Sequence, residues 1–234
     1  MGVDPVTVDT RRASNAQPET TAEQVAEQLR DRIFRGALVP DEPLREVALS
    51  AALSVSRRSV REALLILARQ GLVNHEHYRG ARVRRLVAED VVDLYRVRRA
   101  LEVQGVRASP TASTAARARL KSAYDDLCWR AHEGDSYEII RADLAFHGAV
   151  VGLSDSARID EFFRQISVEM HMAIAMLRAD ETRSGTADVD VVADHAAIYA
   201  HLVGGDVFEA QLAVVSHIDL NERRLLKLVE QTAL

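Results

Sequence analysis

The chain of 234 residues contains one cysteine, five prolines and eleven glycines, and each low count narrows its possible structures. The single cysteine, Cys128, excludes an internal disulfide framework and fits a reducing compartment. Scarce glycine and proline, with abundant alanine, leucine, arginine and glutamate, favour helices over a β-sandwich. No run of about eighteen apolar residues occurs, and residues 1–20 lack the apolar core of a signal peptide. We therefore expect a cytoplasmic protein with no membrane partner.

The net charge of -5 hides an uneven distribution along the chain. Residues 44–86 contain nine arginines and three glutamates, a local balance of +6. Residues 91–234 contain sixteen basic and twenty-two acidic residues, a balance of -6. One basic segment in an otherwise acidic chain indicates that a single module faces nucleic-acid phosphates.

Local patterns at the start of the chain predict a polar tail and two helices. Residues 1–20 are polar and aperiodic, which is typical of a mobile tail. A capping box at residues 21–24 begins a helix that continues to Gly36. A second, short helix is expected over residues 44–53. Its inward-facing residues should be Val47, Leu49 and Leu53.

Residues 55–73 predict the recognition helix of a helix-turn-helix. Ser56 can cap its start, arginine and serine residues occupy its exposed first half, and an apolar stripe follows at spacings of three and four. Short strands at 72–73 and 81–83, on either side of a polar loop, complete a winged helix-turn-helix over residues 21–86. The apolar stripe consists of Val60, Leu64 and Leu67.

Arginine and hydroxyl side chains at the entry of such a helix suit DNA phosphates and guanine edges. A glycine in the wing allows close approach to a groove. The alternative is an ordinary solvated basic face. The expected DNA-binding residues are Arg45, Ser56, Arg57, Arg58, Arg61, Arg79 and Gly80. Ordinary surface charge is expected at Arg69, Arg84 and Arg85.

Helical periodicity dominates after residue 88 and predicts an antiparallel bundle over residues 88–231. The whole chain should therefore be mainly α, with a winged helix-turn-helix followed by about six helices. Asp206 and Glu209 form a cap-like pair at the start of the last one. The expected helices span 88–108, 113–133, 136–152, 155–179, 187–203 and 206–231.

Carboxylate and imidazole groups in the bundle could bind a divalent metal. Asp143 and His147 lie one helical turn apart, and His195 and His217 fall on two other helices. One carboxylate and three imidazoles make a plausible ligand set for a transition metal. The spacing alone equally fits a surface pair or a satisfied core histidine, and His171 and His201 are further candidates.

Several motifs resemble the GntR superfamily of bacterial transcription factors, in its FadR-like branch with an FCD-type C-terminal domain. The N-terminal match rests on residues 40–49, 55–64, 71–73 and 79–83. The C-terminal match rests on residues 94–102, 143–147 and 194–198, with His217 at the usual distance. Arg58-Ser59, where the family commonly has Thr-Pro, and Pro110, in the segment after the first bundle helix, depart from the pattern.

The resemblance implies a metal site, an effector and a mechanism of regulation. It places the metal ligands at Asp143, His147, His195 and His217, binding zinc, nickel or manganese. The metal helps to hold a small carboxylate effector, with Arg98 as its best partner and neighbouring Arg99 as a second candidate. His171 and His201 are then packing or supporting residues.

These features lead to three hypotheses about function. The first is a homodimeric, metabolite-responsive repressor, with an activator as its variant, that binds double-stranded operator DNA. The second is a metal-dependent hydrolase fused to a DNA-binding module. The third is an architectural DNA binder with an inert bundle. The sequence favours the first over the enzyme, because no further convergent base or nucleophile accompanies the metal ligands and the attached winged module would be unexplained.

Overall fold

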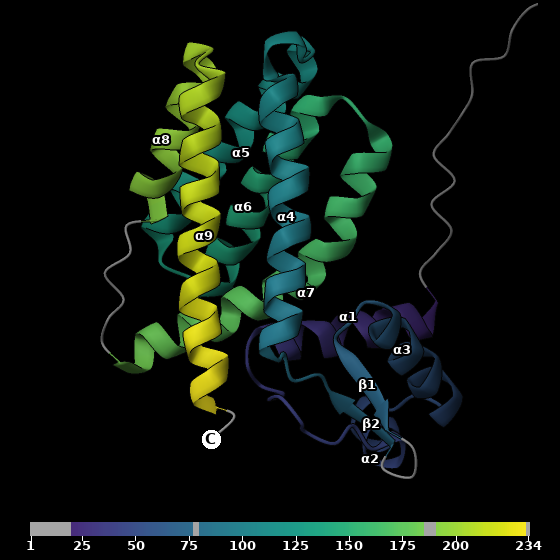
Figure 1. Ribbon diagram of the computed structural model, residues 1–234. Coiled ribbons are helices and arrows are strands. Elements are labelled where there is room, and N and C mark those ends of the chain that lie inside the picture. Colours follow the sequence, from purple (N-terminus) through teal and green to yellow (C-terminus); the bar gives the residue numbers. More distant parts are fainter. Residues whose placement is uncertain (1–19, 77–79, 185–190, 233–234) are drawn as a thin grey trace, which may run out of the picture.

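A computed structural model describes residues 20–76, 80–184 and 191–232, and it confirms a mainly α protein (Figure 1). These residues form nine α-helices and one antiparallel two-stranded sheet. The N-terminal elements are α1 Thr21–Phe34, α2 Glu46–Leu53, α3 Arg57–Arg69, β1 Val73–Glu76 and β2 Gly80–Val83. The bundle consists of α4 Ala88–Ala108, α5 Thr114–Glu133, α6 Ser136–Val151, α7 Ala157–Ser184, α8 Val191–Gly204 and α9 Val207–Thr232. Two short 3-10 turns occupy Ser109–Thr111 and Gly152–Ser154. The expected tail falls almost entirely outside the described residues.

Helices α1 and α3 pack against each other to form the core of the N-terminal unit. Apolar residues recur every three or four positions on both helices and are fully buried at the contact. The apolar stripe expected on the recognition helix is confirmed. The buried residues are Val25, Leu29, Ile33, Val60, Leu64 and Leu67.

The capping box of α1 lies one residue earlier than predicted. Thr20, not Thr21, is the cap: its hydroxyl accepts a hydrogen bond from the Glu23 amide, and the Glu23 carboxylate accepts one from the Thr20 amide. Thr21 is already helical, so its side chain cannot reach the free amides of the first turn.

Helix α2 begins two residues later than predicted, and one of its expected core residues is wrong. Leu44 precedes the helix because its amide donates to the Ala81 carbonyl of β2, which keeps this segment extended. Val47 is 62% exposed, whereas Leu49 is buried. Two residues correspond to about 200° around a helix, so Val47 and Leu49 cannot both face one core. Leu53 is half-buried.

The wing is a hairpin in which β1 pairs antiparallel with β2, with Val73 opposite Val83 and Glu76 opposite Gly80. Strand β1 begins one residue later than predicted and extends into residues expected to be a loop. Gly71, with φ +75°, ends the helical segment before it.

The predicted number of bundle helices is confirmed, with bounds that differ by a few residues. Helices α4 and α9 lie side by side along the bundle, and α6 lies behind them (Figure 1). Helix α7 continues to Ser184, past the predicted end at residue 179, because no helix-breaking residue precedes Gly185. The Glu209 amide donates to Asp206 at the start of α9, as the predicted pair requires. No helix among the described residues is both long and apolar enough to span a membrane.

Helix α7 connects the bundle to the N-terminal unit. Arg84, which follows β2, contacts Glu169 of α7 at 2.5 Å and Asp90 of α4 at 2.7 Å. The His171 ring stacks on Phe34 with 3.8 Å between ring centroids. Arg84 is therefore not ordinary surface charge, because its half-buried guanidinium bridges the two parts of the chain.

Candidate metal centre and nucleic-acid interface

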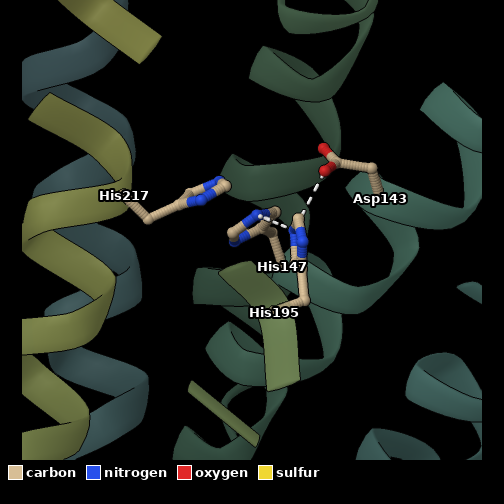
Figure 2. Close-up of side chains that lie close together, drawn as sticks. All are labelled: Asp143, His147, His195 and His217. Atoms are coloured by element: carbon tan, nitrogen blue, oxygen red, sulfur yellow. Dashed lines mark hydrogen bonds and ion pairs between the residues drawn. The ribbon is translucent and has the colours of Figure 1, made fainter. Parts of the chain in front are cut away.

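Three helices bring the four predicted metal ligands together inside the bundle (Figure 2). Helix α6 supplies Asp143 and His147 from one face, α8 supplies His195 and α9 supplies His217. One potential ligand atom of each residue lies within 4.8 Å of those of the other three. Asp143 and His217 are 9% exposed and His147 and His195 at most 1%, so the cluster is shielded from solvent.

Two of the imidazoles are oriented by hydrogen bonds from their outer nitrogens. His147 Nδ1 lies 2.7 Å from Glu102 Oε2 of α4, and His195 Nδ1 lies 2.6 Å from the Val191 carbonyl. A carboxylate and a carbonyl are acceptors, so each Nδ1 carries the proton and each Nε2 points inward with its lone pair. Metal-ligating histidines are typically held in this way.

The inward-facing atoms of the cluster repel one another unless a cation or a proton lies between them. His147 Nε2 and His195 Nε2 are 3.1 Å apart, and His195 Nε2 is 3.0 Å from Asp143 Oδ1. Two lone pairs and a carboxylate oxygen therefore converge on one point. Burial lowers the pKa of His195, but the hydrogen bond and charge of Asp143, together with the hydrogen bond to the Val191 carbonyl, outweigh burial and leave that pKa raised. The donor set fits a divalent metal, which would satisfy all three atoms at once.

His217 completes the cluster from α9. Asn221, one turn further along, lies with its side-chain nitrogen 3.1 Å from His217 Nε2. His217 Nδ1 is buried and has no hydrogen-bond partner among the described residues. Burial and the neighbouring imidazoles, His147 and His195, hold the pKa of His217 well below its usual value. A neutral imidazole with an unused nitrogen is the form that binds a metal.

A buried ion pair lies directly behind His147. Arg98 Nε donates to Glu102 Oε1 at 2.6 Å, and Glu102 in turn accepts from His147. Burial raises the pKa of Glu102, but its electrostatic and hydrogen-bonding interactions with His147 and Arg98 together outweigh burial, so that pKa is lowered. One terminal nitrogen of Arg98 has no hydrogen-bond partner among the described residues. Arg99 points elsewhere and binds Asp219 and Glu222 of α9.

A small cavity of about 30 Å³ adjoins the cluster between α7, α8 and α9. Asp143, His195 and His217 line it together with Arg178 and Arg224. A space of this size holds one or two water molecules.

His171 and His201 lie outside the ligand cluster: the first stacks in the contact with α1, and the second is half-buried on α8.

The predicted DNA-binding residues that the structure describes are all exposed on the N-terminal unit. The Ser59 amide donates to the Ser56 hydroxyl, which caps α3 as predicted. Arg57, Arg58 and Arg61 follow in its first turns, with 62%, 88% and 59% of their side chains exposed. Arg45, just before α2, and Gly80, with φ +79° at the start of β2, are also exposed. Arg79 lies outside the described residues.

Glu46 holds the central arginine of this surface in place. Arg61 donates to both Glu46 carboxylate oxygens, at 2.9 and 2.8 Å, and Arg57 lies 3.9 Å from the same carboxylate. The hydrogen bond from Arg61 lowers the pKa of Glu46. Arg58 pairs separately with Glu62 at 2.9 Å. The arginines are thus arranged around acidic partners on their own surface.

Two family models together cover most of the chain. Residues 21–83 match the bacterial regulatory proteins of the gntR family, and residues 93–220 match the FCD domain. The chain belongs to the GntR family. It is a transcriptional regulator with an FCD domain at its C-terminal end.

Solved structures and curated proteins agree with this assignment. A GntR transcriptional regulator from Rhodococcus sp. RHA1 is 33% identical, with 88% of this chain and 97% of that chain covered and a TM-score of 0.76. The "Probable D-xylose utilization operon transcriptional repressor" of Paenarthrobacter nicotinovorans is 28% identical over 85% of this chain and 87% of its own length. The E. coli protein McbR/YncC, 21% identical with a TM-score of 0.69, shares the fold over 90% of this chain and 99% of its own. The first two of these proteins are named as transcriptional regulators.

Sequence patterns missed three residues that support the sites of this GntR-family regulator. Glu102, Asn221 and Glu46 each contact a predicted site residue but offered no distinctive motif of their own. Glu102 and Asn221 stand four positions after Arg98 and His217, a spacing that brings helix side chains together and could have indicated them. Glu46 is fifteen positions before Arg61, so only the tertiary fold reveals that pair.

Proposed function

We propose that this GntR-family protein is a metabolite-responsive repressor whose FCD domain binds a small carboxylate through a divalent metal. Residues 21–86 serve as the DNA-binding domain and 88–231 as the effector-binding and dimerisation domain. The observation that carries the proposal is the convergence of two imidazole lone pairs and a carboxylate oxygen on one buried point, adjoining a cavity.

Asp143, His147, His195 and His217 would hold the metal, with zinc, nickel and manganese as the candidates. When bound, the metal supplies a Lewis-acidic anchor for an effector oxygen. Glu102 fixes the orientation of His147, and the Val191 carbonyl fixes that of His195. These contacts support a ligand set that is arranged before the metal arrives.

Arg98 is the proposed carboxylate partner beside the metal. Its Nε donates a hydrogen bond to Glu102. One of its terminal nitrogens is fully buried and has no hydrogen-bond partner among the described residues. A buried guanidinium nitrogen without an acceptor is costly, and an effector oxygen would satisfy it.

The DNA contacts are proposed for the exposed arginines around α3. Arg57 and Arg61 are placed to reach base edges, while Arg45, Ser56 and Arg58 suit phosphates. Arg79 and Gly80 would place the wing against the adjacent groove. Repression, as opposed to activation, has the support of the relative named as an operon repressor.

The proposed homodimer uses the outer face of α4 and α9. These two neighbouring helices expose four large apolar side chains, although Trp129, Phe162 and Val203 are exposed elsewhere on the bundle. The residues are Val97, Phe208, Leu212 and Leu220. A second copy of the chain would cover them and place two recognition helices on a pseudo-palindromic operator.

Metal analysis tests the proposed centre. Wild-type protein incubated with zinc, nickel and manganese should retain about one ion per chain after dialysis. The double variant His147→Ala and His195→Ala should retain none. His201→Ala, which removes a histidine outside the cluster from the same helix as His195, should bind like wild type. A wild-type protein that stays metal-free would refute the centre.

DNA binding is tested on an operator selected from a random duplex pool. Arg57→Ala and Arg61→Ala should each weaken specific binding by about 1–3 kcal/mol. Arg69→Ala, at the far end of the same helix, is the matched control and should bind like wild type. If both test variants bind like wild type, α3 is not the recognition helix.

A further inference from the structure

The rim of the cavity beside the metal cluster contains two arginines that share one glutamate. Arg178 NH1 lies 3.5 Å from Glu181 Oε2, and Arg224 NH1 lies 3.3 Å from Glu181 Oε1. Helix α7 contributes Arg178 and Glu181, and α9 contributes Arg224. All three line the cavity that His195 and His217 also line.

Burial makes this glutamate different from the surface ion pairs. The Glu181 side chain is 7% exposed, while those of Arg178 and Arg224 are 25% and 31% exposed. A carboxylate buried to this degree requires charged partners. The two guanidinium groups in turn repel each other unless an anion lies between them. A carboxylate between them offsets this repulsion.

We propose that Arg178 and Arg224 form the carboxylate-recognition subsite of the effector pocket, and that Glu181 fills it as an internal substitute while no effector is bound. The inference rests on the proposed effector function of the FCD domain. A carboxylate of the effector takes the place of the Glu181 carboxylate between the two guanidinium groups, a geometry that suits charge-assisted hydrogen bonds.

The size of the cavity supports the view that an effector replaces the Glu181 side chain and does not bind beside it. About 30 Å³ admits one or two waters but not an organic acid, so a lining side chain has to leave before an effector enters. Departure of Glu181 opens the space and frees both arginines in one movement.

The exchange also gives a basis for selectivity. A tethered carboxylate competes with free carboxylates at an effective concentration in the millimolar range or above. A simple acid therefore cannot displace Glu181 at low concentration. The favoured ligand is an organic acid that carries a second oxygen donor for the metal cluster, because two contacts together outweigh the tethered group.

Replacement of the missing carboxylate by acetate tests the subsite directly. Glu181→Ala removes a CH2–COO⁻ unit, which acetate resembles. The variant should melt at a lower temperature than wild type, and acetate should restore its melting temperature. Half-maximal stabilisation should require at least about tenfold less acetate for the variant than for wild type. Acetamide, which has the same shape without the charge, should have no such effect.

Two further variants show whether the effect belongs to this position. Adding Arg224→Met to Glu181→Ala should abolish the response to acetate, because one guanidinium group is lost. Glu161→Ala is the matched control: it removes another arginine-paired glutamate from α7, but from a solvent-exposed position, and should respond like wild type. Equal responses of Glu181→Ala and wild type would overturn the proposal.

The assay remains informative if Glu181→Ala does not fold by itself. Refolding from urea in acetate and in acetamide then gives the comparison: recovery only in acetate supports the subsite, and equal recovery, including none, overturns it. The melting experiments are run with zinc and with EDTA. Rescue by acetate without stoichiometric metal binding would retain the subsite but refute the metal centre. Absence of rescue in a protein that binds metal would refute the subsite alone.

Discussion

Acidification should weaken the contact between the N-terminal unit and the bundle through one buried histidine. His171 is 4% exposed and stacks on Phe34, and burial, aided by the positive charge of Arg141, lowers its pKa from 6.5 to about 4. The pKa is depressed in the folded state, so the resulting stability is complete above 6.5 and is lost as the pH falls towards 4. Asp31 and Asp143 oppose the shift but do not cancel it.

The magnitude follows from the two pKa values. When the pH falls from about 7.5 to about 5, the His171 imidazole becomes protonated in the unfolded chain but stays mostly neutral in the folded protein. This difference lowers the free energy of unfolding by about 2 kcal/mol. Urea denaturation of EDTA-treated protein at the two pH values measures this cost. His171→Phe keeps an aromatic ring against Phe34 but cannot titrate, so its stability should fall by about 2 kcal/mol less than that of wild type.

Two further variants separate the effect of His171 from that of the three histidines in the metal cluster. Those three histidines are present in wild type and in every variant, so their contribution to the pH dependence of stability is the same in all of them. His201→Gln, on α8 and outside the contact, should retain the wild-type pH dependence. His171→Gln should reproduce the result of His171→Phe, since neither side chain titrates. Identical pH dependence of wild type and both His171 variants would refute the reasoning.

Three further substitutions test the packing and polar contacts around the sites. Glu102→Gln should weaken zinc affinity about 10- to 100-fold, measured by chelator competition, because the His147 ring loses its charged acceptor. Gly105→Ala should destabilise the bundle by about 1–3 kcal/mol in urea, because its Cβ would lie 2.1 Å from the Val150 carbonyl oxygen; Gly204→Ala, with nothing within 4 Å, should not. Glu46→Gln should raise affinity for non-sequence-specific duplex DNA by up to about fivefold, since it releases exposed arginines; unchanged affinity at low salt would contradict this.

The recognition helix and the number of bundle helices were predictable because their signals are local. A serine cap, an apolar stripe and a glycine near the end act within about one or two turns of the helix that they define. The same local information failed for Val47, because six of the eight residues of α2 are apolar and their pattern does not single out a buried side. Only the pairing of Leu44 with Ala81 fixes where α2 begins.

The metal cluster was predictable in part, because two of its ligands lie four residues apart on one helix. The spacing of Asp143 and His147 indicates that they share one helix face. The choice of His195 and His217 over His171 came from family resemblance and not from the residue pattern of this chain. Periodicity places His171 on a helix as readily as the others. Its separation from the cluster depends on how α7 packs against Phe34, a contact between segments far apart in sequence.

Helix α7 gives a physical reason for an effector to influence DNA binding. Glu169, near its middle, contacts Arg84 and lies so close to Gly71 that a Cβ there would be 2.6 Å from the carboxylate carbon. Gly71 follows the recognition helix directly. Three turns further along α7, Glu181 lies at the rim of the metal cavity. A ligand that displaces Glu181 therefore acts on the same helix that positions the end of α3, and a helix transmits such a shift because its backbone is stiff over this length. Effector and operator would be coupled only to the extent that the two positions of α7 differ in affinity for each.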